Sequence, residues 1–133
     1  MLFRSGGSAV AFCAAMAYPA ARFVQPRSRV DTGPVAIGKL EDFPIGGAKT
    51  VIFHDRPVLV LRSSDGQLRA LSAICSHLQC IVGYSADKNQ IECPCHQGVY
   101  STDGQVVSGP PPRPLEELVV TINEGSVLLS TMG

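Results

Sequence analysis

Short runs of apolar and β-branched residues, broken by turn residues, fill the chain from Val35 onward. Runs of this kind predict β-strands rather than helices. We expect strands at Thr50–Phe53, Val58–Arg62, Leu68–Ala73, Gln90–Glu92 and Val99–Ser101. The letters DRP and SSDG mark turns between the first three, and LEELVVTINEGSVLLS predicts a hairpin with NEG at its bend. Many short strands at close spacing predict an all-β sandwich or barrel.

The N-terminal part has a different pattern, an uncharged run from Ser5 to Ala21 between Arg4 and Arg22. As a helix it would span about 26 Å, slightly less than the hydrocarbon core of a bilayer. We interpret residues 1–25 as a membrane anchor. A cleaved signal peptide is an alternative, because AMA resembles a cleavage site, and a buried soluble helix is another. The polar, proline-bounded segment 26–34 then predicts a hinge linker to a domain at 35–133.

Composition and charge exclude several classes of function. Lysine and arginine balance aspartate and glutamate, eleven against eleven, and no basic stripe is present, so we expect no nucleic-acid partner. Thirteen glycines and ten prolines fit loops and short strands. The chain also shows no paired-carboxylate site, no phosphate-binding glycine loop and no local setting for a serine nucleophile.

The candidate chemistry is concentrated in two boxes, CSHLQC at 75–80 and CPCHQGVYS at 93–101. In the first box one residue separates Cys75 from His77, and in the second two residues separate Cys93 from His96. Spacings this short let two side chains of one loop converge on one ion. Two thiolates and two imidazoles could hold zinc, or a [2Fe–2S] cluster with two histidines on one iron and two cysteines on the other.

Each box also has a second cysteine, Cys80 in the first and Cys95 in the second. If the two loops face each other, these thiols can reach bonding distance, and a disulfide would tie loops that have little secondary structure. Such a bond needs an oxidising compartment, in agreement with an anchored domain outside the cytoplasm. A framework made only of disulfides would leave both histidines unexplained.

Together the boxes resemble the signature of Rieske iron–sulfur proteins, C-x-H-x-x-C followed by C-x-C-H, and above all the Rieske subunits of cytochrome bc-type and bf-type complexes. GPPPRPL at 109–115 is similar to the proline loop that covers the cluster in that family. AYPAARFVQP resembles the exit from the anchor, and VAIGKLEDFP the first strand of the head. The resemblance implies a Rieske-type antiparallel β-sandwich with a cluster-binding subdomain at about 74–114, preceded by one transmembrane helix.

The resemblance also implies roles for individual residues. The matching positions are Cys75 and Cys93 on the buried iron, His77 and His96 on the outer iron, Cys80 with Cys95 as the disulfide, and Tyr100 as a hydroxyl donor to a ligand thiolate. Tyr100 as a packed strand aromatic is the alternative for that position.

Two positions depart from the family: Gln79 stands where glycine is usual, and Gly98 stands where many high-potential members have a serine that donates to a cluster sulfur. Losing that donor predicts a lower potential, suited to a quinone such as menaquinone. His54, outside the boxes, is expected to be a surface turn residue.

The function implied by the resemblance is electron transfer. The chain would take one electron and a proton from quinol bound in a cytochrome b subunit and pass the electron to a c-type cytochrome. His77 and His96 would be the residues that act, because neutral imidazoles raise the cluster potential into the range of about −150 to +300 mV and gain affinity for protons on reduction. We expect the head on the periplasmic side of a bacterial inner membrane. The alternatives are the Rieske small subunit of a peripheral oxidoreductase such as arsenite oxidase, a ferredoxin-like carrier for a dioxygenase, and a zinc-binding interaction module.

Overall fold

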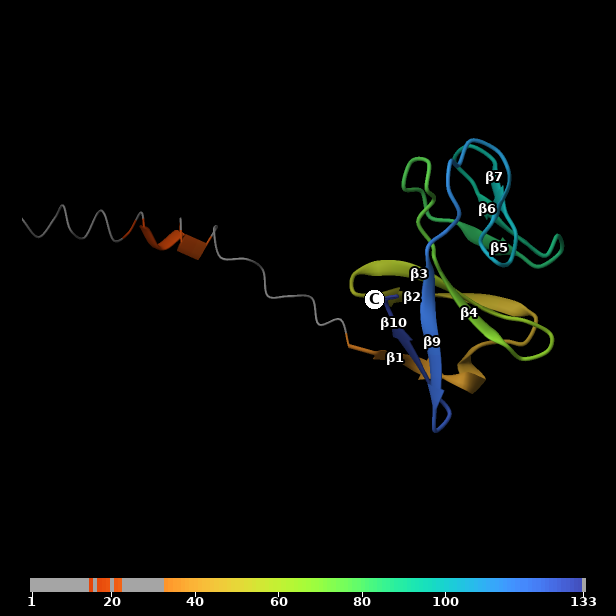
Figure 1. The fold of residues 1–133 in the computed structure, drawn as a ribbon, viewed down its shortest axis with the longest axis horizontal. Helices are drawn as coiled ribbons and strands as arrows, with labels where there is room; N and C mark the ends of the chain where they lie inside the picture. The colour runs from red at the N-terminus through yellow and green to blue at the C-terminus, as the bar shows by residue number, and fades with distance from the viewer. Residues whose placement is uncertain (1–14, 16, 20, 23–32, 133) are drawn as a thin grey trace, which may run out of the picture. The chain divides into compact units, whose positions relative to one another are not determined.

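The structure is a computed structural model that describes residues 15, 17–19, 21–22 and 33–132 (Figure 1). The chain divides into two units, Met1–Asp31 and Thr32–Gly133. The described residues of the first unit are helical. Nowhere in the described parts is there a helix with the length and apolar character needed to cross a membrane. Most of the predicted anchor at 1–25 and of the linker at 26–34 lies outside the described residues, so both stay predictions.

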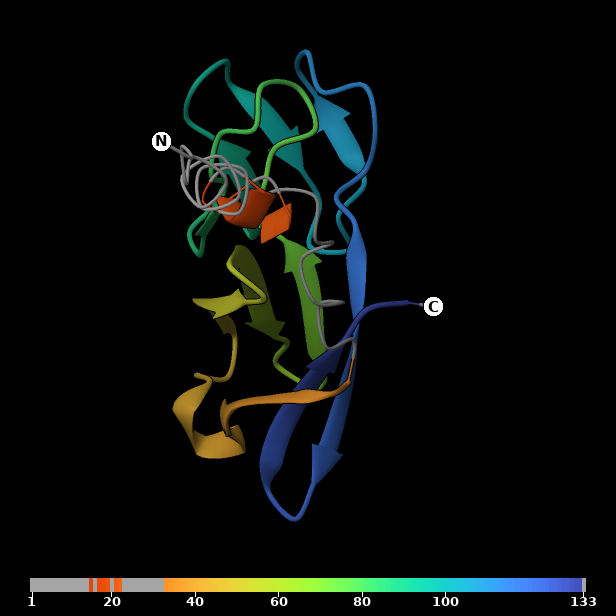
Figure 2. The ribbon, with the colours of Figure 1, turned by 90° about the vertical axis from the view of Figure 1, so that its left-hand side faces the viewer.

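A six-stranded antiparallel sheet forms the larger part of the second unit (Figures 1 and 2). Its order is β1-β10-β9-β4-β3-β2, and a short 3₁₀ helix, η1, follows β1. The bounds are β1 Val35–Lys39, η1 Leu40–Asp42, β2 Gly47–Phe53, β3 Arg56–Arg62, β4 Leu68–Ser72, β9 Glu117–Asn123 and β10 Ser126–Ser130. The edge strands β1 and β2 approach each other, so the sheet curves like a barrel. The expected antiparallel all-β fold is therefore confirmed.

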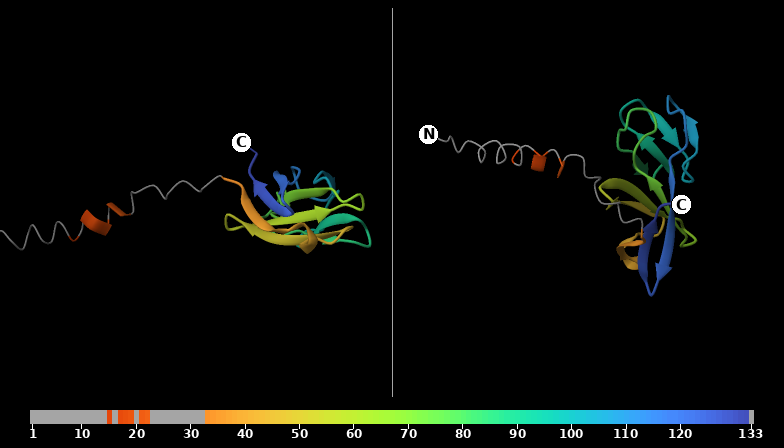
Figure 3. Two further views of the ribbon diagram at one scale, coloured as in Figure 1. Left: turned by 90° about the horizontal axis from the view of Figure 1, so that it is seen from below. Right: turned by 60° about the vertical axis from the view of Figure 1, so that its left-hand side comes forward.

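A second, four-stranded antiparallel sheet is inserted in the chain between β4 and β9. Its strands are β5 Gly83–Ser85, β6 Gln90–Cys93, β7 Gly98–Tyr100 and β8 Val106–Ser108, paired in that order. Figures 1 to 3 show it at one end of the larger sheet, opposite the β9–β10 hairpin. The insertion falls in the range 74–114 where we expect the cluster-binding subdomain.

Strand β3 contributes to two cores, which explains its unbroken apolar run VLVL. Val58 and Val60 pack in a cluster within the larger sheet, whereas Leu59 and Leu61 pack in a cluster shared with the small sheet. A strand buried on both faces shows no alternation of apolar and polar residues. The shared cluster contains Leu71, Ala73, Cys75, Val82, Ile91, Cys93, Tyr100 and Leu115 in addition to the two leucines. It holds the two sheets together and extends to a cysteine of each box.

Most predicted strands are present, with shifted ends, and the hairpin turns at Glu124 and Gly125 as expected. The DRP turn is wrong, because the bend lies at His54 and Asp55, while Pro57 is within β3 and pairs with Ile52. Both bend residues have positive φ, 47° and 61°. A two-residue loop of this kind matches the twist of the flanking strands.

His54 is a turn residue, as expected, but it is only partly exposed. Its ring packs edge-on against Phe53, with 4.2 Å between ring centroids. It therefore covers the end of the core rather than pointing freely into solvent.

Candidate functional site

The two boxes lie in loops of the inserted region, and each places a cysteine inside and a histidine outside. The first box follows β4, and the second connects β6 to β7. Cys75 and Cys93 are 2% and 3% exposed, and neither forms a disulfide. His77 and His96 are exposed, with ring centroids 5.0 Å apart and ring planes at 85°. The four donors singled out in the sequence thus form an inner sulfur pair and an outer nitrogen pair.

The backbone of each box wraps around its buried sulfur in the same way. Cys75 accepts hydrogen bonds from the backbone N–H groups of His77 and Leu78. Cys93 accepts them from the backbone of Cys95 and His96. In both boxes the donors are the residues two and three positions after the cysteine. Hydrogen bonds to an ionised acceptor are stronger than neutral ones, so each loop is built to hold a thiolate.

The two buried thiols interact with each other, and their pKa values move in opposite directions. Burial raises the pKa of the Cys75 thiol, but hydrogen bonds from the Tyr100 hydroxyl, the backbone and Cys93 outweigh it, so the net pKa lies below its ordinary value of 9.0. Burial also raises the pKa of Cys93, and the neighbouring Cys75 adds to this increase. Thiolates are the form in which cysteine binds metals.

Cys80 and Cys95 form a disulfide that joins the two boxes, with 6.5 Å between their Cα atoms. The sulfur of Cys93 lies within 4.8 Å of both of these sulfurs. This group is not a three-sulfur metal site, because disulfide sulfurs are not thiolates. The disulfide instead holds the loops beside the ligand candidates, as the sequence led us to expect.

Tyr100 is fully buried, and its hydroxyl lies next to the first box. The hydroxyl oxygen is 3.2 Å from Cys75 Sγ and accepts a hydrogen bond from the Ser76 backbone N–H at 3.3 Å. Burial, then the hydrogen bond to Cys75, raises the pKa of Tyr100, so its hydroxyl keeps the proton that it donates. Tyr100 is thus both a packed strand aromatic and a hydrogen-bonding partner of a candidate ligand.

Ser76 is a site residue that we did not expect. Its hydroxyl donates to the backbone carbonyl oxygen of Arg113 at 2.7 Å and lies 3.3 Å from the Tyr100 hydroxyl. It therefore fastens the proline loop to the first box. A small hydroxyl residue directly after a candidate ligand cysteine was the only available signal in the sequence, and it did not indicate a partner 37 residues away.

Two glutamines occupy left-handed backbone positions beside the histidines. Gln79 has φ 57° and Gln97 has φ 55°, and both side chains are exposed. Glycine adopts this conformation without a steric penalty, which explains why glycine is usual at position 79 in the resembling family. Gln79 therefore places a side chain on a backbone conformation that glycine also favours. Gln97 has the same conformation and was not singled out from the sequence.

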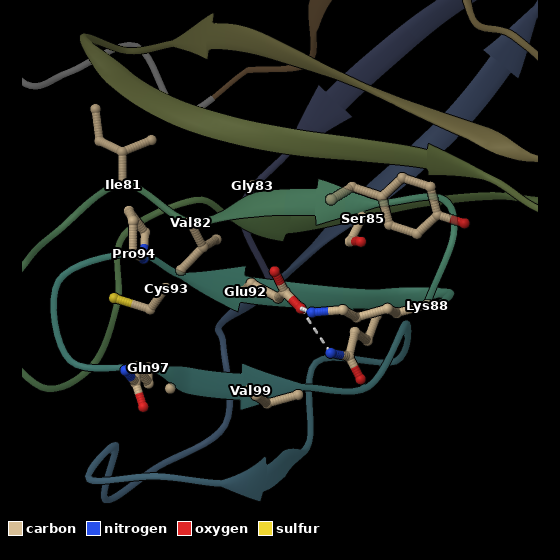
Figure 4. Close-up of a pocket in the computed structure, with 13 residues that line it drawn as sticks. Ile81, Val82, Gly83, Ser85, Lys88, Glu92, Cys93, Pro94, Gln97 and Val99 are labelled. Atoms are coloured by element: carbon tan, nitrogen blue, oxygen red, sulfur yellow. Dashed lines mark hydrogen bonds and ion pairs between the residues drawn. The ribbon is translucent and has the colours of Figure 1, made fainter.

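A surface pocket of about 640 Å³ lies beside the second box, along β5, β6 and β7 (Figure 4). Cys93 lines one end, and at the other end Glu92 pairs with Lys88 at 2.7 Å. None of the other three donor residues lines it. The pocket is therefore a neighbouring hollow and not the space between the four donors.

These features define a class of protein, a small all-β domain with a mixed thiolate–imidazole metal centre. Two buried thiols held by backbone N–H groups suit a shielded iron, and two exposed imidazoles suit a second iron near solvent. The donor set therefore fits a [2Fe–2S] cluster with both histidines on one iron.

Comparison with known proteins identifies the family. The profile of the Rieske [2Fe–2S] domain matches residues 33–121. The cytochrome b6-f complex iron-sulfur subunit of Chlorobaculum tepidum is 35% identical over 127 residues, which cover 94% of this chain and 70% of that protein. The chain belongs to the Rieske [2Fe–2S] family, and its cofactor is the Rieske-type cluster.

Solved structures show the same fold. The cyanobacterial plasma membrane Rieske protein from Synechocystis PCC 6803 has a TM-score of 0.63 and 25% identity, over 73% of this chain and 99% of that one. A chain of a hyperthermophilic respiratory Complex III has a TM-score of 0.62 and 22% identity, over 94% of this chain and 99% of that one. The fold predicted from the boxes is thus shared with this Rieske protein and with a chain of that complex.

Proposed function

We propose that this chain is the electron-transfer iron–sulfur subunit of a membrane quinol–cytochrome c oxidoreductase of the bc or b6-f type. The supporting observation is an inner thiol pair and an outer imidazole pair in a chain that is 35% identical to a b6-f complex iron-sulfur subunit. That relationship favours this function over the small subunit of a peripheral oxidoreductase such as arsenite oxidase. In this role the chain carries electrons, and the complex as a whole is the enzyme.

The proposed ligands divide by burial. Cys75 and Cys93, enclosed in the shared core, would hold the inner iron, and His77 and His96 would hold the outer iron. The bound cluster supplies a one-electron redox centre. The disulfide and the backbone N–H groups keep the two boxes in place around it.

The exposed histidines are the proposed point of contact with the reaction partners. A quinol must lose a proton as well as an electron, and His77 or His96, bound to iron through one ring nitrogen, would accept that proton on the other ring nitrogen from its deprotonated, imidazolate form. Added negative charge nearby raises the proton affinity of an imidazole, so proton uptake follows electron uptake. The proposed partners are quinol, the cytochrome b subunit that binds it, and a c-type cytochrome that accepts the electron.

The proposed location is the periplasmic side of a bacterial inner membrane, with residues 1–25 as the anchor and 26–34 as the hinge. The Cys80–Cys95 disulfide supports an oxidising compartment. A hinge would allow the head to move between the quinol site and the cytochrome.

The absence of a serine at position 98 supports a low-potential member of the family. A hydrogen bond to a cluster sulfur stabilises the more negative reduced state, and glycine offers no side-chain donor. Tyr100 retains the other donor. We therefore propose a potential below that of members with both donors, suited to menaquinol.

Purification from membranes tests the function. The native chain should be isolated with a cytochrome b and with quinol–cytochrome c reductase activity, and it should contain two irons and two acid-labile sulfides. The reduced sample should give a Rieske electron paramagnetic resonance signal. A zinc-containing chain without iron, or an iron-containing chain isolated free of any cytochrome and of membranes, would contradict the proposal.

A further inference from the structure

The second box and the proline loop meet at a glycine that has no room for a side chain. A Cβ atom added to Gly98 would lie 2.7 Å from Cγ and 3.1 Å from Cδ of Pro111, and 3.4 Å from Cβ of Cys93. Contacts below 3.0 Å do not occur for real Cβ atoms, so one of the two residues would have to move. The Pro111 ring therefore occupies the space that a side chain at position 98 would need.

Pro111 is the inward-facing member of its proline run. Pro111 is buried, whereas Pro110 and Pro112 on either side are exposed. The ring that turns inward is the one that contacts Gly98, on the same side as the Cys93 side chain. The position of this ring thus decides how the loop covers the second box.

A second glycine brings the two backbones together. Gly109 has φ +94°, and a Cβ atom on it would lie 2.8 Å from Gly98 Cα and 2.9 Å from the Gln97 carbonyl oxygen. Val99 pairs with Ser108 in the β7–β8 ladder, so Gly98 and Gly109 are the next opposing positions. The contact continues the ladder beyond its last pair.

The proline loop is thus fixed at both ends. At one end Gly109 and Pro111 pack against Gly98 of the second box, and at the other end the Ser76–Arg113 hydrogen bond attaches the loop to the first box. The loop bridges the two boxes in addition to the disulfide. A displacement at position 98 would open one end while the other stays attached.

We propose that Gly98 and Pro111 are a matched pair of positioning residues that set how tightly the proline loop closes over the Cys93 side of the cluster. This inference rests on the cluster assignment in the proposed function. It predicts that the two positions are coupled: a side chain at 98 is disruptive only while the proline ring is present. Replacing Pro111 with alanine removes the two proline ring atoms that a Cβ at 98 would meet and leaves only the ordinary contact with Cys93 Cβ at 3.4 Å.

A double-mutant cycle on the cluster-loaded full chain tests the coupling. The variants are Gly98→Ala, Pro111→Ala and the two combined. The first readout is the rate at which an iron chelator bleaches the cluster, the second is the midpoint potential, and the third is the melting temperature. We expect Gly98→Ala to bleach about tenfold faster, the usual scale of an overpacked contact, and to shift the midpoint potential. The double variant should recover more than half of both changes.

Two matched controls separate this role from general effects of the substitutions. Gly83→Ala adds a methyl group in β5 where nothing lies within 4 Å. Pro112→Ala removes an exposed proline from the same run. Both should keep the wild-type bleaching rate and midpoint potential. The inference is overturned if Gly98→Ala behaves like Gly83→Ala, or if the effects of the two single substitutions simply add.

The outcomes distinguish this inference from the proposed function. A wild-type chain without a Rieske spectrum overturns the proposed function and the cluster-covering role together. A wild-type Rieske spectrum with an additive cycle overturns only the pairing of Gly98 with Pro111. The melting temperatures report the packing contact whether or not the cluster is present.

Discussion

The hydroxyl oxygen of Tyr100 lies 3.2 Å from the sulfur of Cys75, so the third strand of the small sheet touches the first box directly. The two residues are 25 positions apart in the sequence. The contact is buried, and burial strengthens a hydrogen bond by lowering the local dielectric constant. A side chain of the second box is thus placed to stabilise negative charge on the candidate ligand sulfur of the first box.

Replacing Tyr100 with phenylalanine should lower the midpoint potential. The ring would still fill the core, but the sulfur would lose a donor that favours the more negative reduced state. If the bond favours the reduced state tenfold, the drop is about 60 mV for a one-electron couple. A redox titration of the cluster measures it. Tyr84→Phe is the matched control, because the Tyr84 hydroxyl bonds to Asn89 instead, and an equal drop in that variant would contradict the assignment.

Removing the disulfide should destabilise the head. Cys80 and Cys95 close a loop with a sequence separation of 15, and a crosslink of this length contributes about 3 kcal/mol in the chain-entropy account. The Cys80→Ala, Cys95→Ala double variant should therefore melt roughly 10 to 20 °C lower than the wild type. Calorimetry with and without a thiol reductant checks the cause. The reductant should lower the melting temperature of the wild type and leave the variant unchanged.

Glycine at positions 79 and 97 should stabilise the loops. A left-handed conformation costs a residue with a Cβ atom roughly 1–2 kcal/mol, and the added chain entropy of glycine offsets part of the gain. Gln79→Gly and Gln97→Gly should each raise the free energy of unfolding by about 0.5–1 kcal/mol. Gln105→Gly is the control, since Gln105 is exposed and has no positive φ. Thermal unfolding in which all three variants lose stability alike would count against this explanation.

Much of this molecule could be predicted from its sequence because its signals are local. The spacing of Cys75 from His77 and of Cys93 from His96 indicated two ligand pairs, and the structure gathers them into an inner and an outer pair. The long apolar runs of β3 and of the β9–β10 hairpin gave strands near their observed ends. Strong periodicity and short ligand spacings need no knowledge of distant contacts.

The remaining features depend on contacts between distant segments. Strands β5 and β8 have three residues each, too few for any periodicity to show. The Ser76–Arg113 hydrogen bond and the packing of Pro111 against Gly98 join segments that are distant in the sequence, and no local pattern indicates either contact. The bend at His54 was placed too late because the following proline suggested a turn, although Pro57 is tolerated in β3 beside Ile52.

Restoring a serine at position 98 should raise the potential only when Pro111 is also replaced. A serine Cβ meets the same obstacle as any other Cβ, 2.7 Å from Pro111 Cγ, so in Gly98→Ser the loop and the serine cannot both keep their places. In Gly98→Ser, Pro111→Ala the obstructing ring atoms are gone, so the serine hydroxyl would be available to donate to a cluster sulfur. Its midpoint potential should exceed that of Gly98→Ala, Pro111→Ala by about 60 mV, if the new bond favours the reduced state tenfold. This comparison cancels the effect of the lost proline and of the added Cβ, and it isolates the hydroxyl. Equal potentials in the two double variants would show that the missing serine does not lower the potential of this chain. A wild-type midpoint near the upper end of the Rieske range, about +300 mV, would do the same.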